Sequence, residues 1–247
     1  MKISKNTILI TGGGSGIGFE LAKLLTGQGN KVIITGRNKA KLENAVAALK
    51  SANYIHADIT DAHDVNRLVQ TLNINFPSLN ILINNAGTAQ YYRLTDDGAD
   101  TFDKAGDEIL TNYLSVARLT EKLLPLLRKN GPAAIANVSS IVGFVPTVHL
   151  PTYSASKAAL HSYTRVLRHT LAASNEDVKV FELMPPLVNT EFSKAIGGEK
   201  GMDPKDVAQA LVSGMEHDLF EIHPGMTADL YQLYLSSPEA AMAAINN

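Results

Sequence analysis

Tyr153 and Lys157 are a pair of side chains whose types and spacing could carry out proton transfer. They stand four residues apart at the start of an expected helix, so both lie on one face, one turn apart. A cation beside a phenol stabilises the phenolate, so we expect Lys157 to lower the pKa of Tyr153 from about 10 towards neutrality. A tyrosine tuned in this way can donate or accept a proton at working pH. The pair alone is also compatible with an exposed helix pair, because this spacing occurs by chance in many helices.

A glycine-rich turn between a short apolar run and a helical pattern could hold a second reactant. Residues 11–18 read Thr-Gly-Gly-Gly-Ser-Gly-Ile-Gly. Backbone without Cβ atoms can press against a pyrophosphate, and a helix N-terminus offers it N–H groups. The spacing is G-x-x-x-G-x-G, at Gly12, Gly16 and Gly18; neither G-x-G-x-x-G nor the Gly-Lys-Ser/Thr of a P-loop is present. The turn therefore predicts a bound dinucleotide, with an ordinary glycine-rich turn as the alternative.

The residues after the second expected strand distinguish two dinucleotides. Binding a ribose 2′-hydroxyl usually takes an acidic residue there. Here the strand ends Thr35-Gly36-Arg37-Asn38, with no acid. Arg37 can instead bind a 2′-phosphate through its planar, bidentate guanidinium. We therefore predict NADP(H) over NAD(H), with a solvent-facing arginine as the alternative.

Strand-like and helix-like segments alternate along almost the whole chain and must position these groups. Short apolar runs predict seven strands, at residues 7–10, 31–35, 54–59, 80–83, 133–138, 178–184 and 220–222. Helix-length segments separate them, which is typical of βαβ units with a parallel sheet and helices on both faces. The expected fold class is α/β: one domain over residues 1–247, with a Rossmann-type, doubly wound, mostly parallel sheet.

Two segments that follow expected strands look irregular, residues 88–106 and 189–202. Ligands bind at this edge of such sheets. Glycines at 197, 198 and 201 make 189–202 either a mobile substrate loop or a solvated surface loop. The tail, residues 226–247, carries an apolar stripe (Leu230, Leu233, Tyr234 and Leu235) that belongs either to the core or to a subunit contact.

Composition excludes several classes of protein. The chain has 247 residues, of which 45% are hydrophobic, and this suits one large domain with a buried core. A formal charge of −2 does not suggest a nucleic-acid or membrane partner. With no cysteine and no H-E-x-x-H spacing, we expect no disulfide, thiolate or metal site. No apolar run is long enough for a signal peptide or a transmembrane helix, so we expect a cytoplasmic protein.

Taken together, the motifs resemble those of the classical short-chain dehydrogenase/reductase family over nearly the whole chain. They are residues 11–18, Asp58, residues 84–87, Asn112, Ser140 and the run Tyr-Ser-Ala-Ser-Lys at 153–157. The resemblance implies that Tyr153 protonates the substrate oxygen in carbonyl reduction and that Ser140 orients and polarises the carbonyl. It also implies that Lys157 holds the nicotinamide ribose, and that Asn112 carries a water linking Lys157 to solvent.

The same resemblance assigns the cofactor residues. Asp58 would bind the adenine amino group and Asn85 the adenosine ribose side, while the Val188 backbone and the Thr190 side chain would hold the carboxamide. The full set is Gly12, Gly14, Ser15, Gly16, Ile17, Gly18, Arg37, Asn38, Asp58, Ile59, Asn85, Ala86, Gly87, Tyr153, Lys157, Pro185, Val188 and Thr190. Pro186 departs from the family, which usually has glycine there; proline fixes φ and removes an N–H.

Two further segments are similar to the DltE-type branch of bacterial oxidoreductases: Met-Pro-Pro at 184–186 and Leu-His-Ser at 160–162. The family is typically oligomeric, often through the helices that hold Asn112 and Tyr153. We therefore expect a homodimer or homotetramer, and a monomeric mass by light scattering would overturn that expectation.

The leading functional hypothesis is an NADP(H)-dependent carbonyl reductase or alcohol dehydrogenase that acts on a small molecule. A non-catalytic NADP(H)-binding regulator is the alternative, but it would not need Asn112, Ser140, Tyr153 and Lys157 together. A methyltransferase would explain neither the Tyr153–Lys157 pair nor Arg37. His161 is interpreted as a packing residue. Side chains that could build a mainly apolar pocket, for a ketone with an apolar or aromatic group, are Tyr91, Tyr92, Phe144, Val145, His149, Leu150 and Phe192.

Overall fold

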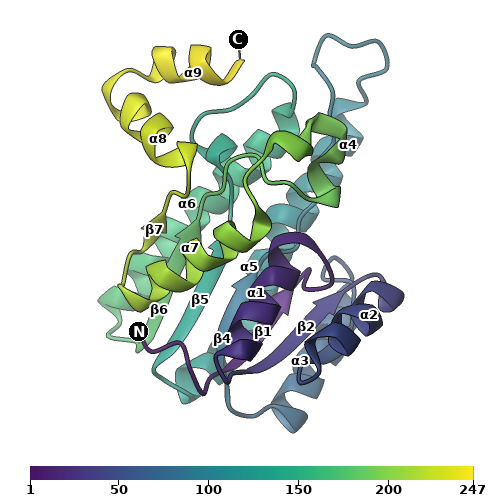
Figure 1. Ribbon diagram of the computed structural model, residues 1–247, viewed down its shortest axis with the longest axis vertical. Helices are drawn as coiled ribbons and strands as arrows, with labels where there is room; N and C mark the ends of the chain where they lie inside the picture. The colour runs from purple at the N-terminus through teal and green to yellow at the C-terminus, as the bar shows by residue number, and fades with distance from the viewer. Residues whose placement is uncertain (247) are drawn as a thin grey trace.

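Seven strands form one parallel sheet through the middle of the molecule (Figure 1). The computed structural model describes residues 1–246. Along the sheet the order is β3-β2-β1-β4-β5-β6-β7, and every neighbouring pair is parallel. The strands are β1 (Thr7–Thr11), β2 (Lys31–Gly36), β3 (Asn53–His56), β4 (Leu79–Asn84), β5 (Ala133–Val138), β6 (Val178–Leu183) and β7 (Glu221–Ile222).

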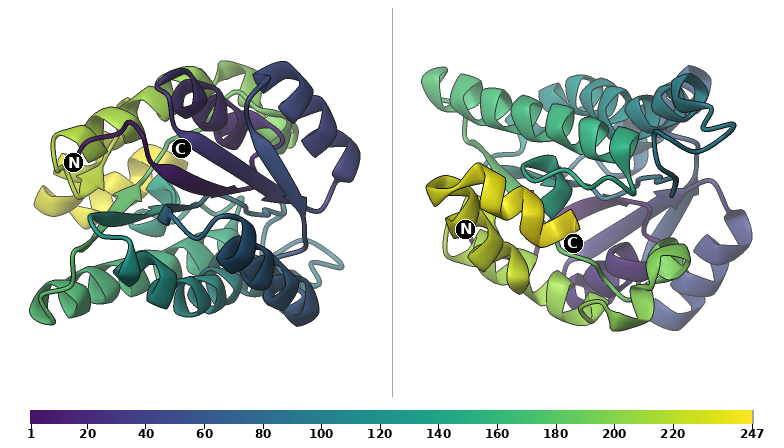
Figure 2. Two further views of the ribbon diagram at one scale, coloured as in Figure 1. Left: turned by 90° about the horizontal axis from the view of Figure 1, so that it is seen from below. Right: turned by 90° about the horizontal axis from the view of Figure 1, so that it is seen from above.

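Helices cover both faces of this sheet, as Figure 2 shows from below and above. One face packs against α1 (Gly16–Gly27), α2 (Lys39–Leu49) and α7 (Pro204–Glu216). The other packs against α3 (Ala62–Asn75), α5 (Ser115–Lys129) and α6 (Pro151–Ala173), and α4 (Thr101–Ile109) packs on α6. Within residues 1–246, no helix combines the length and apolar character needed to cross a membrane.

The alternation of side chains along β1 shows how the two layers form. Ile8 and Ile10 belong to the core under α1, α2 and α7, whereas Leu9 belongs to the core under α3 and α5. All three side chains are fully buried. Because successive strand residues point to opposite faces, a continuous apolar run is what a strand covered on both faces requires.

The strand order reverses between β1 and β4, which are neighbours although β2 and β3 lie between them in sequence. This is the doubly wound, Rossmann-type arrangement predicted from the sequence, and such folds bind ligands at the carboxyl ends of the strands beside the reversal. The glycine turn follows β1, and residues 85–87 follow β4, so both lie at that position.

The two segments expected to be irregular are partly ordered. Residues 101–106 belong to α4, so the helical region begins earlier than predicted. Within residues 189–202, two short 3-10 helices form, Glu191–Ile196 and Gly198–Lys200. The N–H of Asn189 donates to the carbonyl of Met202 at 2.8 Å, which closes the base of this loop.

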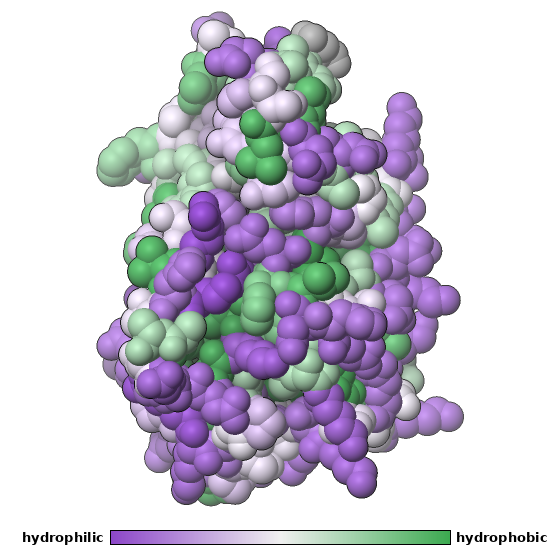
Figure 3. All heavy atoms as spheres, turned by 90° about the vertical axis from the view of Figure 1, so that its left-hand side faces the viewer, coloured by the Kyte–Doolittle hydropathy of each residue, from purple (hydrophilic) through white to green (hydrophobic). Residues whose placement is uncertain are grey.

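The C-terminal tail forms two helices, α8 (Met226–Ser236) and α9 (Pro238–Asn246). They stand out from the body as a lobe with apolar and polar side chains on its surface (Figure 3). Leu230 is buried, and Leu233 and Tyr234 pack beside it, so most of the apolar stripe is intramolecular core. Leu235 is exposed. The Asn246 side chain accepts a hydrogen bond from the Val148 N–H at 2.8 Å, which joins the lobe to the loop before α6.

Candidate active site

The glycine turn has the backbone that its sequence predicts. Gly12 and Gly16 have φ angles of +65° and +54°, in the left-handed region that favours glycine. A Cβ on Gly18 would lie 2.4 Å from the carbonyl oxygen of Gly12, so the helix start presses against the turn. Ser15, the N-cap of α1, makes no side-chain cap. The first N–H groups of α1 thus remain available for an anion such as a pyrophosphate.

Gly18→Ala is expected to lower both the Tm and the affinity for a dinucleotide, because the added methyl group must displace the turn. Overpacking of this kind costs about 1–3 kcal/mol. Thermal denaturation and a cofactor fluorescence titration measure the two effects. Gly27→Ala is the matched control on the same helix, because within residues 1–246 its Cβ would meet nothing within 4 Å beyond its chain neighbours and the backbone of its own helix. Equal Tm and equal affinity for the two variants would contradict the close approach at Gly18.

The segment after β4 is tied to the glycine turn. The N–H groups of Asn85 and Ala86 both donate to the Thr11 hydroxyl at 3.0 Å. The Asn85 side chain donates to the Thr11 carbonyl at 2.9 Å. These bonds hold the ends of β1 and β4 together, so Asn85 serves the site at least by shaping it. Gly87 lies beside the Asn112 and Lys157 side chains, since its Cβ would be 3.1 Å from Asn112 Oδ1 and 3.7 Å from Lys157 Nζ.

Asn112 lies in a π-helical turn, Leu110–Leu114, between α4 and α5, and is fully buried. Its Oδ1 accepts from the Thr88 N–H at 2.9 Å, and its Nδ2 donates to the Thr88 carbonyl at 2.8 Å and to Ser156 Oγ at 2.9 Å. Both amide protons are therefore used by the protein. Asn112 anchors the segment after β4 to α6, and any water held by its side chain would have to bind Oδ1.

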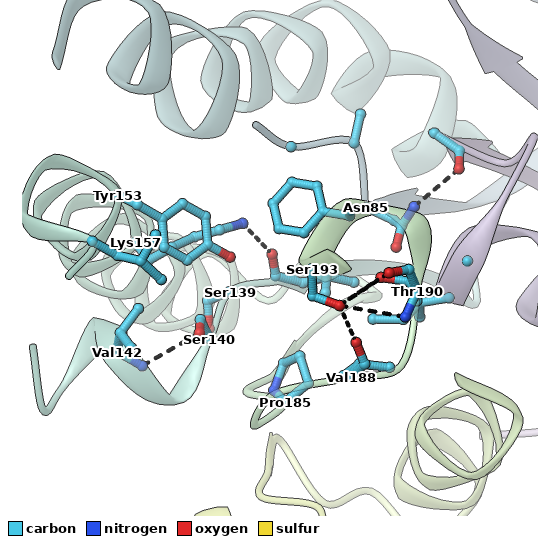
Figure 4. A pocket seen from close by; sticks show the side chains of 18 of the residues that line it. Asn85, Ser139, Ser140, Val142, Tyr153, Lys157, Pro185, Val188, Thr190 and Ser193 are labelled. Carbon is cyan, nitrogen blue, oxygen red and sulfur yellow. Dashed lines mark hydrogen bonds between the residues drawn. The ribbon is translucent and has the colours of Figure 1, made fainter. Parts of the chain in front are cut away.

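Tyr153 and Lys157 extend from the first turns of α6 towards Ser140, with Asn85 and Thr190 across the cavity (Figure 4). Pro151 starts the helix, where its missing N–H costs nothing. Lys157 Nζ donates to the Val138 carbonyl at 2.9 Å and lies 5.6 Å from the centroid of the Tyr153 ring. Ser140 follows β5, and its Oγ accepts from the Val142 N–H at 3.3 Å. The three predicted residues thus meet at one place.

The electrostatics of this group differ from the prediction. Burial raises the pKa of the Tyr153 phenol above its ordinary value, an effect that the Ser140 hydroxyl opposes only in part. Lys157 Nζ lies over the ring and donates to the Val138 carbonyl, and its proximity does not overcome the effect of burial on the phenol pKa. Burial also lowers the pKa of Lys157 to about 8, and the Glu182 carboxylate opposes this shift. The predicted direction for Tyr153 was therefore wrong for this structure, and at neutral pH the phenol keeps its proton.

One cavity of about 680 Å³ connects these residues. Of the predicted site residues, it is lined by Gly12, Ser15, Gly16, Ile17, Arg37, Asp58, Ile59, Asn85, Ala86, Gly87, Ser140, Tyr153, Lys157, Pro185, Val188 and Thr190. Four predicted residues lie behind its wall instead. Gly14 and Gly18 pack within the turn and against α2, Asn38 caps α2 by accepting from the Lys41 N–H, and Asn112 is buried as described. The volume of this cavity and its lining by the glycine turn suit a dinucleotide.

The end of the cavity beside β2 is where the two dinucleotides differ. Arg37 lines it, and in residues 1–246 its guanidinium forms no hydrogen bond or ion pair. Asp58 follows β3, and its Oδ1 accepts from the Thr60 N–H and hydroxyl at 2.8 and 2.7 Å. One carboxylate oxygen of Asp58 is thus committed to its own turn, while Arg37 has all its donors available for a phosphate.

Pro185 and Pro186 line the cavity after β6, and the departure from glycine at 186 leaves the connection intact. The Pro185 carbonyl accepts from the Ile141 N–H at 3.0 Å, which fixes the segment after β6 against the Ser140 turn. Ser193 donates to the Val188 carbonyl, so the start of the 189–202 loop is held against the wall. Thr190 approaches the glycine turn, because a Cβ on Gly16 would lie 3.2 Å from its Cγ2.

Four of the seven side chains expected around the substrate line the cavity: Tyr91, His149, Leu150 and Phe192. The Tyr91 and His149 rings stack with centroids 5.3 Å apart. The expectation was wrong for Tyr92, Phe144 and Val145, which are buried outside the cavity; the Tyr92 hydroxyl, for example, bonds Thr152 at 2.9 Å. Their apolar character is used for packing.

Three titratable residues near the site were not identified as part of it by sequence reasoning. Glu182 in β6 and Glu108 in α4 are fully buried. The Glu108 Oε1 accepts from the Gln90 N–H at 2.7 Å, and burial raises the pKa of this carboxyl. His161, interpreted as a packing residue, lies 3.0 Å from Glu182 through its Nδ1. No motif marks these positions, since a buried acid in a strand looks like an exposed one in sequence. In the described part of the chain, no cluster of His, Asp or Glu side chains could hold a metal ion.

The fold and this site define an oxidoreductase of the short-chain dehydrogenase type. The model of the short chain dehydrogenase family matches residues 6–201, and the chain belongs to this family. It is 37% identical over 208 residues to the uncharacterized oxidoreductase DltE of Bacillus subtilis, covering 84% of this chain and 81% of that protein. An uncharacterized oxidoreductase of Staphylococcus aureus strain MW2 is 34% identical over 208 residues, and the match covers 83% of this chain and 88% of that protein.

Solved structures agree in fold. A short chain dehydrogenase from Burkholderia cenocepacia in complex with NADP superposes with a TM-score of 0.88 at 26% identity, covering 100% of both chains. A short chain dehydrogenase/reductase from Burkholderia phymatum in complex with NAD gives a TM-score of 0.88 at 22% identity, covering 97% of this chain and 96% of that one. Proteins with this fold thus bind either dinucleotide.

Proposed function

We propose that this protein is an NADP(H)-dependent oxidoreductase that interconverts a carbonyl and an alcohol, with Tyr153 as general acid and base. One observation carries the proposal: the Tyr153 phenol and the Ser140 hydroxyl line the same cavity as the glycine turn. A phenol in that place has no role in binding a pyrophosphate. It is suited to exchange a proton with a substrate oxygen.

Three residues of the cavity have different roles in the proposed carbonyl reduction. The bound cofactor would supply the reducing equivalent to the carbonyl carbon. Tyr153 keeps its proton at neutral pH, because burial raises its pKa, and donates it to the substrate oxygen. The Ser140 oxygen already accepts from the Val142 N–H, so its own proton can bond the same substrate oxygen. One N–H of the Lys157 ammonium donates to the Val138 carbonyl, and the other two can donate to ribose hydroxyls.

The preference for NADP(H) rests on Arg37. Its guanidinium lines the cavity beside β2, and no acidic residue stands at the end of that strand. A 2′-phosphate would form a charge-assisted, bidentate contact with it. The ribose 2′-hydroxyl of NAD(H) would find no carboxylate acceptor at that position.

The proposed substrate is a ketone with an apolar or aromatic group, used in the cytoplasm. The stacked pair Tyr91–His149 lines one side of the cavity, and the Phe192 ring lies 6.2 Å from the Tyr153 ring. Leu150 adds an apolar surface beside them. Flat aromatic surfaces of this kind favour stacking with a substrate ring.

A panel of aryl ketones, aliphatic ketones and keto esters tests this function, with NADPH oxidation followed by absorbance. We expect turnover of aryl ketones or keto esters and little turnover of a small polar ketone such as dihydroxyacetone. Tight NADPH binding without turnover of any carbonyl would contradict the enzyme and favour the regulatory alternative.

A further inference from the structure

Glu182 is a buried carboxylate directly behind the active site. It lies in β6, is 0% exposed and pairs in register with Asn137 of β5 and Glu221 of β7. Its Oε1 accepts from the Ser139 hydroxyl at 2.5 Å. His161 Nδ1 lies 3.1 Å from Oε1 and 3.0 Å from Oε2. One carboxylate thus joins a residue after β5 to a residue of α6.

Burying the Glu182 carboxylate costs free energy, and packing alone does not explain why a charged side chain stands at this position. Removing a carboxylate from water is strongly unfavourable unless partners compensate. Neither Glu182 nor His161 lines the cavity, so they do not touch a ligand there. A buried apolar side chain would fill the same space without that penalty.

Two contacts connect Glu182 to residues that do line the cavity. Ser139 precedes Ser140 in sequence, and its N–H donates to the Leu183 carbonyl at 2.9 Å. With the side-chain bond to Glu182, Ser139 is held to β6 at two points. The second connection is electrostatic: the negative charge of Glu182 raises the pKa of Lys157 and so opposes the effect of burial.

We propose that Ser139, Glu182 and His161 form a positioning triad, in which Glu182 fixes the Ser140 turn through Ser139 and acts on Lys157 from its contact with His161, one turn further along α6. His161 is the partly buried end of the triad that reaches solvent, with its side chain 18% accessible. It stands one turn after Lys157 on α6. The role of Ser140 and Lys157 in this inference rests on the proposed function.

Other charges around the triad come from α6 and β7. The hydrogen bond to Glu182 raises the pKa of His161, the Glu221 charge acts in the same direction, and burial and Arg165 oppose them. Arg168 binds Glu221 at 3.1 Å, which offsets part of that negative charge. His223, beyond β7, has its pKa lowered by burial. Among these charges, that of Glu182 raises the pKa of Lys157.

The test is the pH dependence of Glu182→Gln, which keeps the shape and removes the charge. In the wild type, NADPH affinity and kcat/KM for NADPH are expected to fall above the Lys157 pKa of about 8, and we call this fall the alkaline limb of the pH profile. In Glu182→Gln the alkaline limb is expected to move down by roughly one pH unit, because the loss of a negative charge lowers the pKa of Lys157. An NMR titration, independent of activity, is expected to show the His161 pKa falling towards its ordinary value. The proposal would be overturned if the alkaline limb stays in place while the His161 pKa falls. It would also be overturned if the His161 pKa is unchanged in Glu182→Gln.

Three variants complete the experiment. Glu182→Asp keeps the charge and is expected to keep the alkaline limb. Ser139→Ala is expected to lower kcat roughly tenfold without moving the limb, since it removes one charged hydrogen bond. If Glu182→Gln does not fold, an unchanged kcat in Ser139→Ala overturns the proposal. His169→Gln, at an exposed position two turns after His161, is expected to match the wild type.

Failure of the proposed function gives a different result. If no carbonyl is reduced, kcat cannot be measured, but the pH limb of NADPH affinity still reports on Lys157. A shifted limb then supports the charge role of Glu182 without the reaction, and an unshifted one contradicts it.

Discussion

Tyr153→Phe is expected to lower kcat for carbonyl reduction by about 10²–10⁴-fold, the usual contribution of a positioned proton donor. The ring stays in its place against the Phe192 ring, because only the hydroxyl is removed. NADPH affinity is therefore expected to stay within about threefold of the wild type, since the phenol donates to substrate in the transition state. Steady-state kinetics and a fluorescence titration of NADPH measure the two quantities.

Tyr163→Phe is the matched control for this variant. Tyr163 lies on the same helix, pairs edge-on with Tyr113 at 5.9 Å and does not line the cavity. It is expected to keep the wild-type kcat. A Tyr153→Phe variant that reduces substrates as fast as Tyr163→Phe would show that proton transfer uses another group.

Arg37→Asp is expected to reverse the cofactor preference. The wild type is expected to favour NADPH, because a charged hydrogen bond to the 2′-phosphate contributes about 1.5–3 kcal/mol. The variant loses that contact, repels the phosphate and gains a carboxylate that can accept from the 2′-hydroxyl of NADH. The ratio of kcat/KM for NADPH over NADH is expected to fall by about 10²–10³-fold.

Lys39→Asp separates this local effect from the change in net charge. Lys39 begins α2 two residues later, and its side chain forms an ion pair with Glu43 at 3.7 Å. The same charge change there is expected to alter the ratio by less than threefold. A wild type that prefers NADH, or equal effects of the two variants, would contradict the assignment of Arg37.

The fold was predictable because its signals are local. Apolar runs such as Ile8–Ile10 mark strands covered on both faces, and the glycine turn marks the change from β1 to α1. The ends of strands and helices were less predictable where a hydrogen bond from a side chain turns the backbone. The third strand ends at His56 instead of 59, because Asp58 bonds the Thr60 N–H and turns the chain.

The site was predictable where a motif fixes a residue and not where packing decides its surroundings. The positions of Ser140, Tyr153 and Lys157 in one cavity follow from their places at strand and helix ends. The pKa of Tyr153 was mispredicted, since it depends on how deeply the fold buries the phenol. The contact between Glu182 and His161 was missed for a related reason: it joins β6 to α6, and no sequence spacing shows it.

Isotope transfer tests the central claim most directly. An aryl ketone that the panel identifies as a substrate is reduced in the presence of NADPH deuterated at the nicotinamide C4, and the alcohol is analysed by mass spectrometry and NMR. With the correct face labelled, the account predicts one deuterium at the carbinol carbon with the wild type and almost no labelled alcohol with Tyr153→Phe. Deuterium-free alcohol from both C4 epimers, or equal labelled product from both proteins, would contradict it.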